Sequence, residues 1–222
     1  MRIAIGVGAA IVVLGVLAQL FAPGIAARVV RNRVEKYGSV ESVEVKAWPA
    51  VKLAWGHADE VRVSAGRLKM SLGQAVSLLK GAKGVAKMQM RAKSMEMEGL
   101  RLTDANLTKH GNALRAQGVV SEEDVKRALP EGVDMAFVKS EAGTVEVRAS
   151  GGLFGVGVSV DAVAQAEEGK LVARPTGLLL SELKLTAFED PNVYVEGVEA
   201  HALGGKSGEG ARYEVSMWAS LR

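Results

Sequence analysis

The side chains that could carry acid–base or metal chemistry are few and scattered. The three histidines, His57, His110 and His201, lie in unrelated stretches, and none has the i, i+4 partner of a helical zinc site. The chain contains no cysteine, which excludes thiol nucleophiles, disulfides and cysteine-ligated metals. We therefore expect histidines at surfaces or turns, and no metal site.

Two segments come close to catalytic motifs without completing them. Gly157-Val158-Ser159-Val160-Asp161 lacks the last glycine of a nucleophile elbow. Gly204-Gly205-Lys206-Ser207 lacks the first glycine of a phosphate-binding loop, because Ala200 occupies that position. The adjacent carboxylates Glu122-Glu123 and Glu189-Asp190 suit a helix start and a turn. We predict no catalytic residue, no cofactor and a protein that is not an enzyme.

Charge and composition narrow the class of partner. The 222 residues include 28 Lys and Arg against 25 Asp and Glu, with the two signs interleaved along the chain. No basic run is interleaved with aromatic residues, so a nucleic-acid partner is not expected. Hydrophobic residues make up 48% but aromatic residues only 5%, so Val, Leu, Ala and Met must fill the core.

The N-terminal segment predicts contact with a membrane. From Ile3 to Ala27 it contains no charge and one strongly polar side chain, Gln19. That length exceeds the roughly 20 residues of a membrane span and the apolar part of most signal peptides, which favours an uncleaved anchor over residues 1–27. A cleaved signal is the alternative, because residues 24–27 are mostly small. One domain is expected over residues 28–222.

A basic cluster follows this segment and bears on orientation. Arg28, Arg31, Arg33 and Lys36 would, by the positive-inside rule alone, place the following domain in the cytoplasm. An apolar segment after a charged N-terminus is also the ordinary export signal, and we expect the domain outside the cytoplasm. Arg28, Arg31 and Arg33 would then lie at the level of lipid head groups.

Alternating apolar and charged residues predict strands along most of the remaining chain. The predicted strands are 43–47, 61–65, 88–91, 95–98 running into 100–102, 145–149, 154–160, 183–188, 193–202 and 213–218. Helices are expected at 25–37, ended by Gly38, at 71–80, and at 121–129, where Ser121 is the expected N-cap. Strands and helices do not alternate regularly, which favours an α+β fold with one large antiparallel sheet.

Methionines on the expected inward strand faces allow two interpretations. Met70, Met88, Met90, Met95, Met97 and Met135 are ordinary core residues if the sheet and helices close on each other completely. Flexible thioethers also suit an apolar lining for lipid acyl chains, and a membrane tether favours that interpretation.

The order of these elements resembles a known family. The apolar segment, the short basic helix, Trp48-Pro49 before an apolar pair of strands, AQGVVSEEDVKRAL at 116–129 and the closing strands are similar to the LmeA-type phospholipid-binding proteins of actinobacteria. The resemblance covers most of residues 28–222, and Val119 to Val125 matches it residue by residue. It implies a curved sheet packed with a few helices around an apolar cavity, similar to tubular lipid-binding domains. It also implies phospholipid binding in the cell envelope and support of lipoglycan maturation.

Two non-enzymatic functions follow. In the first, the protein holds or transfers phospholipid in the envelope, and its acyl-chain lining consists of Val45, Leu53, Trp55, Val61, Val63, Met88, Met90, Met95, Met97, Leu100, Leu102, Phe154, Val156 and Val158. In the second, the sheet has a solid core and serves as a structural or adaptor module for a protein partner. An envelope hydrolase is disfavoured, because the usual nucleophile and base constellations are absent from the sequence.

Overall fold

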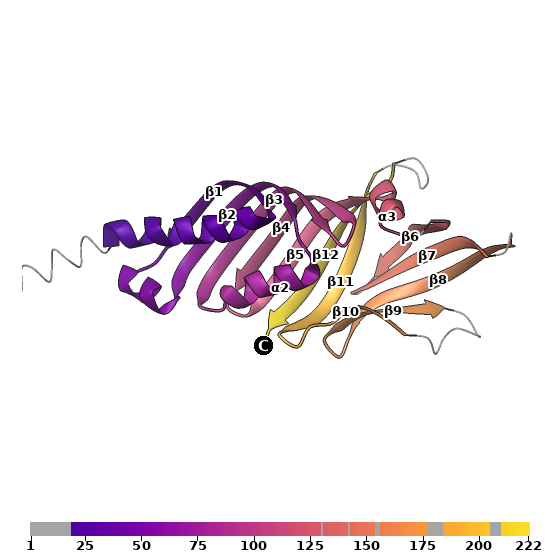
Figure 1. Ribbon diagram of the computed structural model, residues 1–222. Coiled ribbons are helices and arrows are strands. Elements are labelled where there is room, and N and C mark those ends of the chain that lie inside the picture. Colours follow the sequence, from indigo (N-terminus) through magenta and orange to yellow (C-terminus); the bar gives the residue numbers. More distant parts are fainter. Residues whose placement is uncertain (1–18, 130, 142, 154–155, 177–183, 205–209) are drawn as a thin grey trace, which may run out of the picture.

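The computed structural model describes residues 19–222 except 130, 142, 154–155, 177–183 and 205–209 (Figure 1). Strands dominate the described chain, and they form two sheets. The first helix occupies residues 19–34 and continues as the 3-10 turn η1 (Glu35–Tyr37). It ends at Gly38, as expected, where a φ of 152° starts the first strand.

The larger sheet has seven strands in the order β1-β2-β3-β4-β5-β12-β11. Their bounds are β1 (Gly38–Lys46), β2 (Ala58–Lys69), β3 (Val85–Met97), β4 (Leu100–His110), β5 (Ala113–Ser121), β12 (Arg212–Leu221) and β11 (Val193–Gly204). All neighbouring pairs are antiparallel except β2 and β3, which are parallel. A parallel pair needs a crossover, and the helix α2 (Leu72–Gly81) provides it.

The smaller sheet has five strands in the order β10-β9-β8-β7-β6. Their bounds are β6 (Val133–Glu141), β7 (Thr144–Leu153), β8 (Val156–Glu167), β9 (Lys170–Thr176) and β10 (Leu185–Phe188). It lies beyond β11 in Figure 1 and packs against that strand. The Ala200 amide donates to Ser140 Oγ at 3.0 Å, and the Val195 amide donates to the Gly169 carbonyl at 2.9 Å. These bonds join β11 to the edge strand β6 and to the β8–β9 turn of the second sheet.

Serine caps fix the starts of the two later helices. Ser71 Oγ accepts from the Gln74 amide, and the Gln74 side chain accepts from the Ser71 amide, so a complete capping box starts α2. Ser121 Oγ accepts from the Asp124 amide at 3.1 Å, and α3 (Glu122–Ala128) follows. The predicted helices at 71–80 and 121–129, and the predicted cap at Ser121, are confirmed.

The helices cover one face of the seven-stranded sheet, here called the inner face. The first helix packs Ala26, Ala27 and Val30 over β1, β2 and β3, and Val34 is 5% exposed there. Val76 and Leu79 of α2 cover the ends of β5, β12 and β11, whereas Val125 of α3 covers the opposite ends of β5 and β12. The parts of the inner face beneath the three helices form the main core. Burial of their aliphatic side chains is the chief favourable contribution to folding.

Several expectations about the fold differ from the structure. The α+β prediction is confirmed, but the strands form two sheets instead of one. The stretches 88–91 and 95–98 belong to one long strand, β3, and only 100–102 lies on the neighbouring strand. In the first helix, Val30 and Val34 pack against the sheet, whereas Val29 is 55% exposed. No strand was predicted for β6 or β9.

Candidate functional site

A row of apolar residues crosses the middle of the inner face. The strand registers align Val43, Val63, Met90, Leu107, Ala116, Met217 and Val198, one from each of the seven strands. We call this the central row. Val63 is buried, and the other six members are half-buried. An apolar row that crosses the whole sheet is therefore only partly covered by the protein itself.

The neighbouring row, which lies beneath the first helix on β1 and β2 and beneath α2 on β5 and β12, shows the contrast. Val45, Val61, Lys109, Leu114, Ala219 and Val195 are all buried, and only Met88 in that row is half-buried. Strand β12 shows the same change within one element. Tyr213 beneath α3 and Ala219 and Leu221 beneath α2 are buried, whereas Val215 and Met217 between them are half-buried. On β12, burial is therefore lowest between the residues beneath α3 and those beneath α2.

The fourteen residues predicted to line an acyl-chain tunnel fall into distinct places. Val45, Val61, Val63 and Met95 are buried core residues beneath the first helix. The half-buried inner-face members are Met88, Met90, Met97, Leu100 and Leu102. The structure thus brings these nine residues onto one face of the sheet, but only Val63 and Met90 belong to the central row.

The other predicted lining residues lie elsewhere. Leu53 and Trp55 belong to the 3-10 helix η2 (Ala50–Trp55), where Leu53 packs against the core and Trp55 is 69% exposed. Phe154 lies outside the described residues. Val156 and Val158 belong to β8 of the second sheet, and their side chains lie outside the description.

Sequence reasoning missed most of the central row. Leu107, Ala116, Met217, Val198 and Val43 were not singled out, because each is an ordinary strand residue in its own segment. The register across the seven strands makes them neighbours, and no local pattern encodes that register. The strand predicted at 213–218, which carries Met217, is confirmed as part of β12.

One cation lies on the inner face without having been expected there. Lys109 is 1% exposed, and its Nζ donates to the Val85 carbonyl oxygen. Its register neighbours are Met88 and Leu114, so its surroundings are largely apolar. Burial lowers the pKa of the Lys109 ammonium group, because a desolvated charge is less stable than the neutral amine.

The three arginines predicted to meet head groups have different environments. Arg28 is exposed on the first helix. The Arg31 guanidinium donates to the Val40 and Glu41 carbonyls at 3.3 and 3.2 Å, which ties the helix to β1. Arg33 is exposed and lies beside α2, with its Nη1 2.9 Å from the point where a Cβ on Gly81 would stand. Arg28 has the environment best suited to a partner outside the fold.

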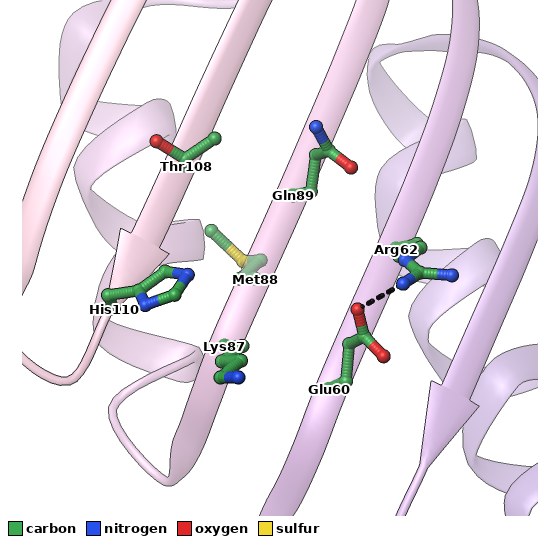
Figure 2. Close-up of a pocket in the computed structure, with 7 residues that line it drawn as sticks. All are labelled: Glu60, Arg62, Lys87, Met88, Gln89, Thr108 and His110. Atoms are coloured by element: carbon green, nitrogen blue, oxygen red, sulfur yellow. Dashed lines mark ion pairs between the residues drawn. The ribbon is translucent and has the colours of Figure 1, made fainter.

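The opposite, outer face of the sheet has a shallow polar pocket of about 160 Å³ (Figure 2). Its lining residues are Glu60, Arg62, Lys87, Met88, Gln89, Thr108 and His110. Arg62 and Glu60 form an ion pair at 2.6 Å. Burial opposes ionisation of Glu60, but Lys46 and Arg62 outweigh it, so the pKa of Glu60 is lowered. The pocket is smaller than ordinary ligand pockets, and its charged lining does not suit an acyl chain.

Groups for catalysis or metal binding are not assembled in the described part of the chain. His57, His110 and His201 are each exposed, as expected of surface histidines, and lie in the η2–β2 connection, on β4 and on β11. In the same residues, no three acidic or histidine side chains are grouped to hold a metal ion. The described helices also include none that is both long and apolar enough to cross a membrane.

In the described residues, the site is an apolar row on a helix-covered sheet, and no polar reaction centre is assembled there. Comparison with protein families gives the class of the protein. The model of the LmeA-like phospholipid-binding family matches residues 12–208, and the chain belongs to that family. Neither a search of curated proteins nor one of solved structures gave a significant match.

Proposed function

We propose that this protein holds a phospholipid in the cell envelope by laying an acyl chain along the central row. The single observation that carries the proposal is the row itself, which is continuous, apolar and half-buried between two covered regions. Membership of a phospholipid-binding family supports the ligand class. We assign the protein the role of holding lipid between membranes or transferring it during envelope maturation.

The length of the row suits one acyl chain. Five neighbouring strands, from Met90 on β3 to Val198 on β11, are separated by four spacings of about 4.8 Å, which gives roughly 19 Å. One leaflet of a bilayer has a hydrocarbon depth of about 15 Å, which is the reach of one chain. An acyl chain lying across the strands would contact Met90, Leu107 and Met217.

Burial supplies the driving force. Each buried methylene contributes about 0.8 kcal/mol, so eight methylenes on the row would contribute roughly 6 kcal/mol before ordering costs. The methionines Met90 and Met217 suit chains of different shape, because their thioether side chains are flexible. In this proposal the first helix, α2 and α3 form the rim of an apolar cavity whose floor is the sheet.

We also propose that the domain faces the extracytoplasmic side and that the apolar N-terminal segment directs it there. The support is the uncharged stretch of sequence from Ile3 to Ala18, directly before the first described helix residue. Such a stretch is typical of export signals and anchors. A carbonate-wash and protease-protection experiment on intact cells tests both statements.

Lipid binding is tested by filling the row. Ala116→Phe places a ring at the centre of the row and keeps it apolar. Ala113→Phe is the matched control, because it is on the same strand, exposed and outside the row. We expect native mass spectrometry with organic extraction of the full chain to find phospholipid on the parent protein and the control, and about tenfold less on Ala116→Phe.

The result that overturns the proposal is equally definite. Equal phospholipid on Ala116→Phe and Ala113→Phe, at unchanged melting temperature, would remove the central row as the binding surface. A parent protein that neither co-purifies with lipid nor takes labelled phospholipid from vesicles would favour the adaptor function instead.

A further inference from the structure

Exposed apolar side chains gather at one end of the molecule, next to the start of the described chain. Leu20, Phe21 and Ile25 of the first helix are 68%, 63% and 62% exposed. Trp48, Val51 and Trp55, in or beside η2, are 74%, 52% and 69% exposed. We call these six residues the apolar tip. They lie at the left end of Figure 1, farthest from the second sheet.

Two hydrogen bonds join the two halves of the tip. Gln19 Nε2 donates to the Ala47 carbonyl at 3.1 Å, and Gln19 Oε1 accepts from the Ala50 amide at 2.7 Å. The one strongly polar side chain of the apolar segment is therefore used to hold the first helix against the Trp48 loop. Leu20 and Phe21 thus stand beside the loop that carries the tryptophans.

The tryptophan loop is held in place by Asp59. Its carboxylate accepts from the Trp48 amide at 2.6 Å and from the Lys52 ammonium group. The hydrogen bonds from Lys52 and Trp48 lower the pKa of the Asp59 carboxyl, so it stays ionised at neutral pH. A loop fixed in this way presents Trp48 and Trp55 outward in a defined position, without further ordering on contact with a partner.

We propose that the apolar tip docks the folded domain on a lipid bilayer surface, independently of the ligand on the central row. Tryptophan combines a large apolar ring with one N–H group, and it is enriched where membranes meet water. We choose a bilayer as the partner because an apolar stretch of sequence adjoins the tip. Residues 3–18 are uncharged and directly precede Gln19, whose side chain bonds to Ala47, the residue before Trp48 of the tip.

The position of Arg28 agrees with the same partner. Arg28 comes seven positions after Phe21, which places it on the same side of the helix about 10 Å further along the axis. With Phe21 and Ile25 among acyl chains, the exposed Arg28 would lie at the level of the phosphates. This favours Arg28 over Arg31 for the head-group contact, since Arg31 is bonded to β1.

The three tryptophans provide the test within the full chain. Single-tryptophan proteins are made as Trp55→Phe with Trp218→Phe, Trp48→Phe with Trp218→Phe, and Trp48→Phe with Trp55→Phe. Trp218 is the matched control, because it lies on β12 beside Arg115, with the guanidinium 5.4 Å from the ring centre. Each protein is reconstituted into vesicles of two lipids. These are phosphatidylglycerol and a phosphatidylcholine whose acyl chains carry bromine.

We expect the brominated chains to quench emission from Trp48 and from Trp55 at least about twofold, and to leave Trp218 unchanged. Equal quenching of all three would overturn the proposal. A different result is that neither acrylamide in the water nor bromine in the bilayer quenches Trp48 and Trp55. That result would show that a protein, such as a second copy, covers the tip. Lipid extraction from the same samples reports the central row separately, so loss of one function is distinguishable from loss of the other.

Discussion

The two sheets bury their inward faces by different means. The seven-stranded sheet carries long aliphatic and methionine side chains, and helices pack across them. The five-stranded sheet turns small residues such as Ala162, Ala164 and Ala173 towards the side on which Ser140 bonds to β11. Small side chains let strands from two sheets approach directly, whereas long ones leave space that helices must cover.

This difference separates two roles. In the first sheet, the helices cover the ends of the inner face and leave the central row half-buried, which is where we place the ligand. The second sheet buries few residues deeply, Val145 and Val172 among them, and joins its strands by pairs such as Arg148 with Asp161 at 2.6 Å. Stability should therefore reside mainly in the first sheet, with the second attached to it.

The largest expected effect tests where the stability resides. Leu68 is fully buried beneath the first helix, and Leu68→Ala should lower the free energy of unfolding by about 3 kcal/mol, because it leaves a cavity in a packed core. Leu171→Ala is the counterpart on half-buried β9, with an expected loss of about 1 kcal/mol. Urea unfolding followed by circular dichroism compares them, and equal losses would contradict a dominant first sheet.

The attachment of the second sheet is tested at Gly169. Its φ is 83°, and an added Cβ would stand 2.2 Å from Tyr194 Cδ2, so Gly169→Ala should cost about 2 kcal/mol and loosen the β8–β9 turn from β11. Gly143 has a φ of 82° with open space around it, and Gly143→Ala isolates the backbone strain, about 1 kcal/mol.

Hydrogen exchange measures the attachment. Faster exchange of the Val195 amide, which bonds to Gly169, is expected in Gly169→Ala and not in Gly143→Ala. Identical exchange in both variants would show that this turn does not hold the sheets together.

The smallest effect concerns the buried cation of the first sheet. The pKa of Lys109 is lower in the folded protein than its usual 10.5, so the unfolded chain binds more protons between those two values. The Lys109 contribution to stability should therefore rise with pH between the pKa of the folded protein and 10.5, and be constant above 10.5. Lys109→Met should remove that slope. The free energy of unfolding is measured against pH for the parent protein and for Lys109→Met. The same pH dependence in both proteins would contradict a lowered pKa of Lys109.

The features predicted correctly from the sequence are those set by contacts between residues close together in the chain. Ser121 and Gly38 set helix ends through contacts a few residues away, and the predictions there are confirmed. The alternation over Val61 to Ala65 likewise identifies the buried face of β2. The parallel pairing of β2 with β3 and the two-sheet arrangement depend on contacts between distant segments, so no local pattern revealed them.

The candidate site divides in the same way. Met88, Met90, Leu100 and Leu102 were recognised as inward-facing, because alternation is local. The alignment of Met90 with Met217, more than a hundred positions later, follows from the strand order and register. The exposure of Trp55 was also missed, since an apolar residue predicts burial unless an outside partner is considered.

The place of β12 in the strand order has a consequence for synthesis. β12 pairs on one side with β5 and on the other with β11, although 90 residues lie between the end of β5 and its start. β5 is synthesised early, and its edge that pairs with β12 stays unpaired until the whole second sheet and β11 have been synthesised. Such an edge is a template for wrong pairing. Chaperone protection of the nascent chain should therefore matter most in the interval before β12 emerges.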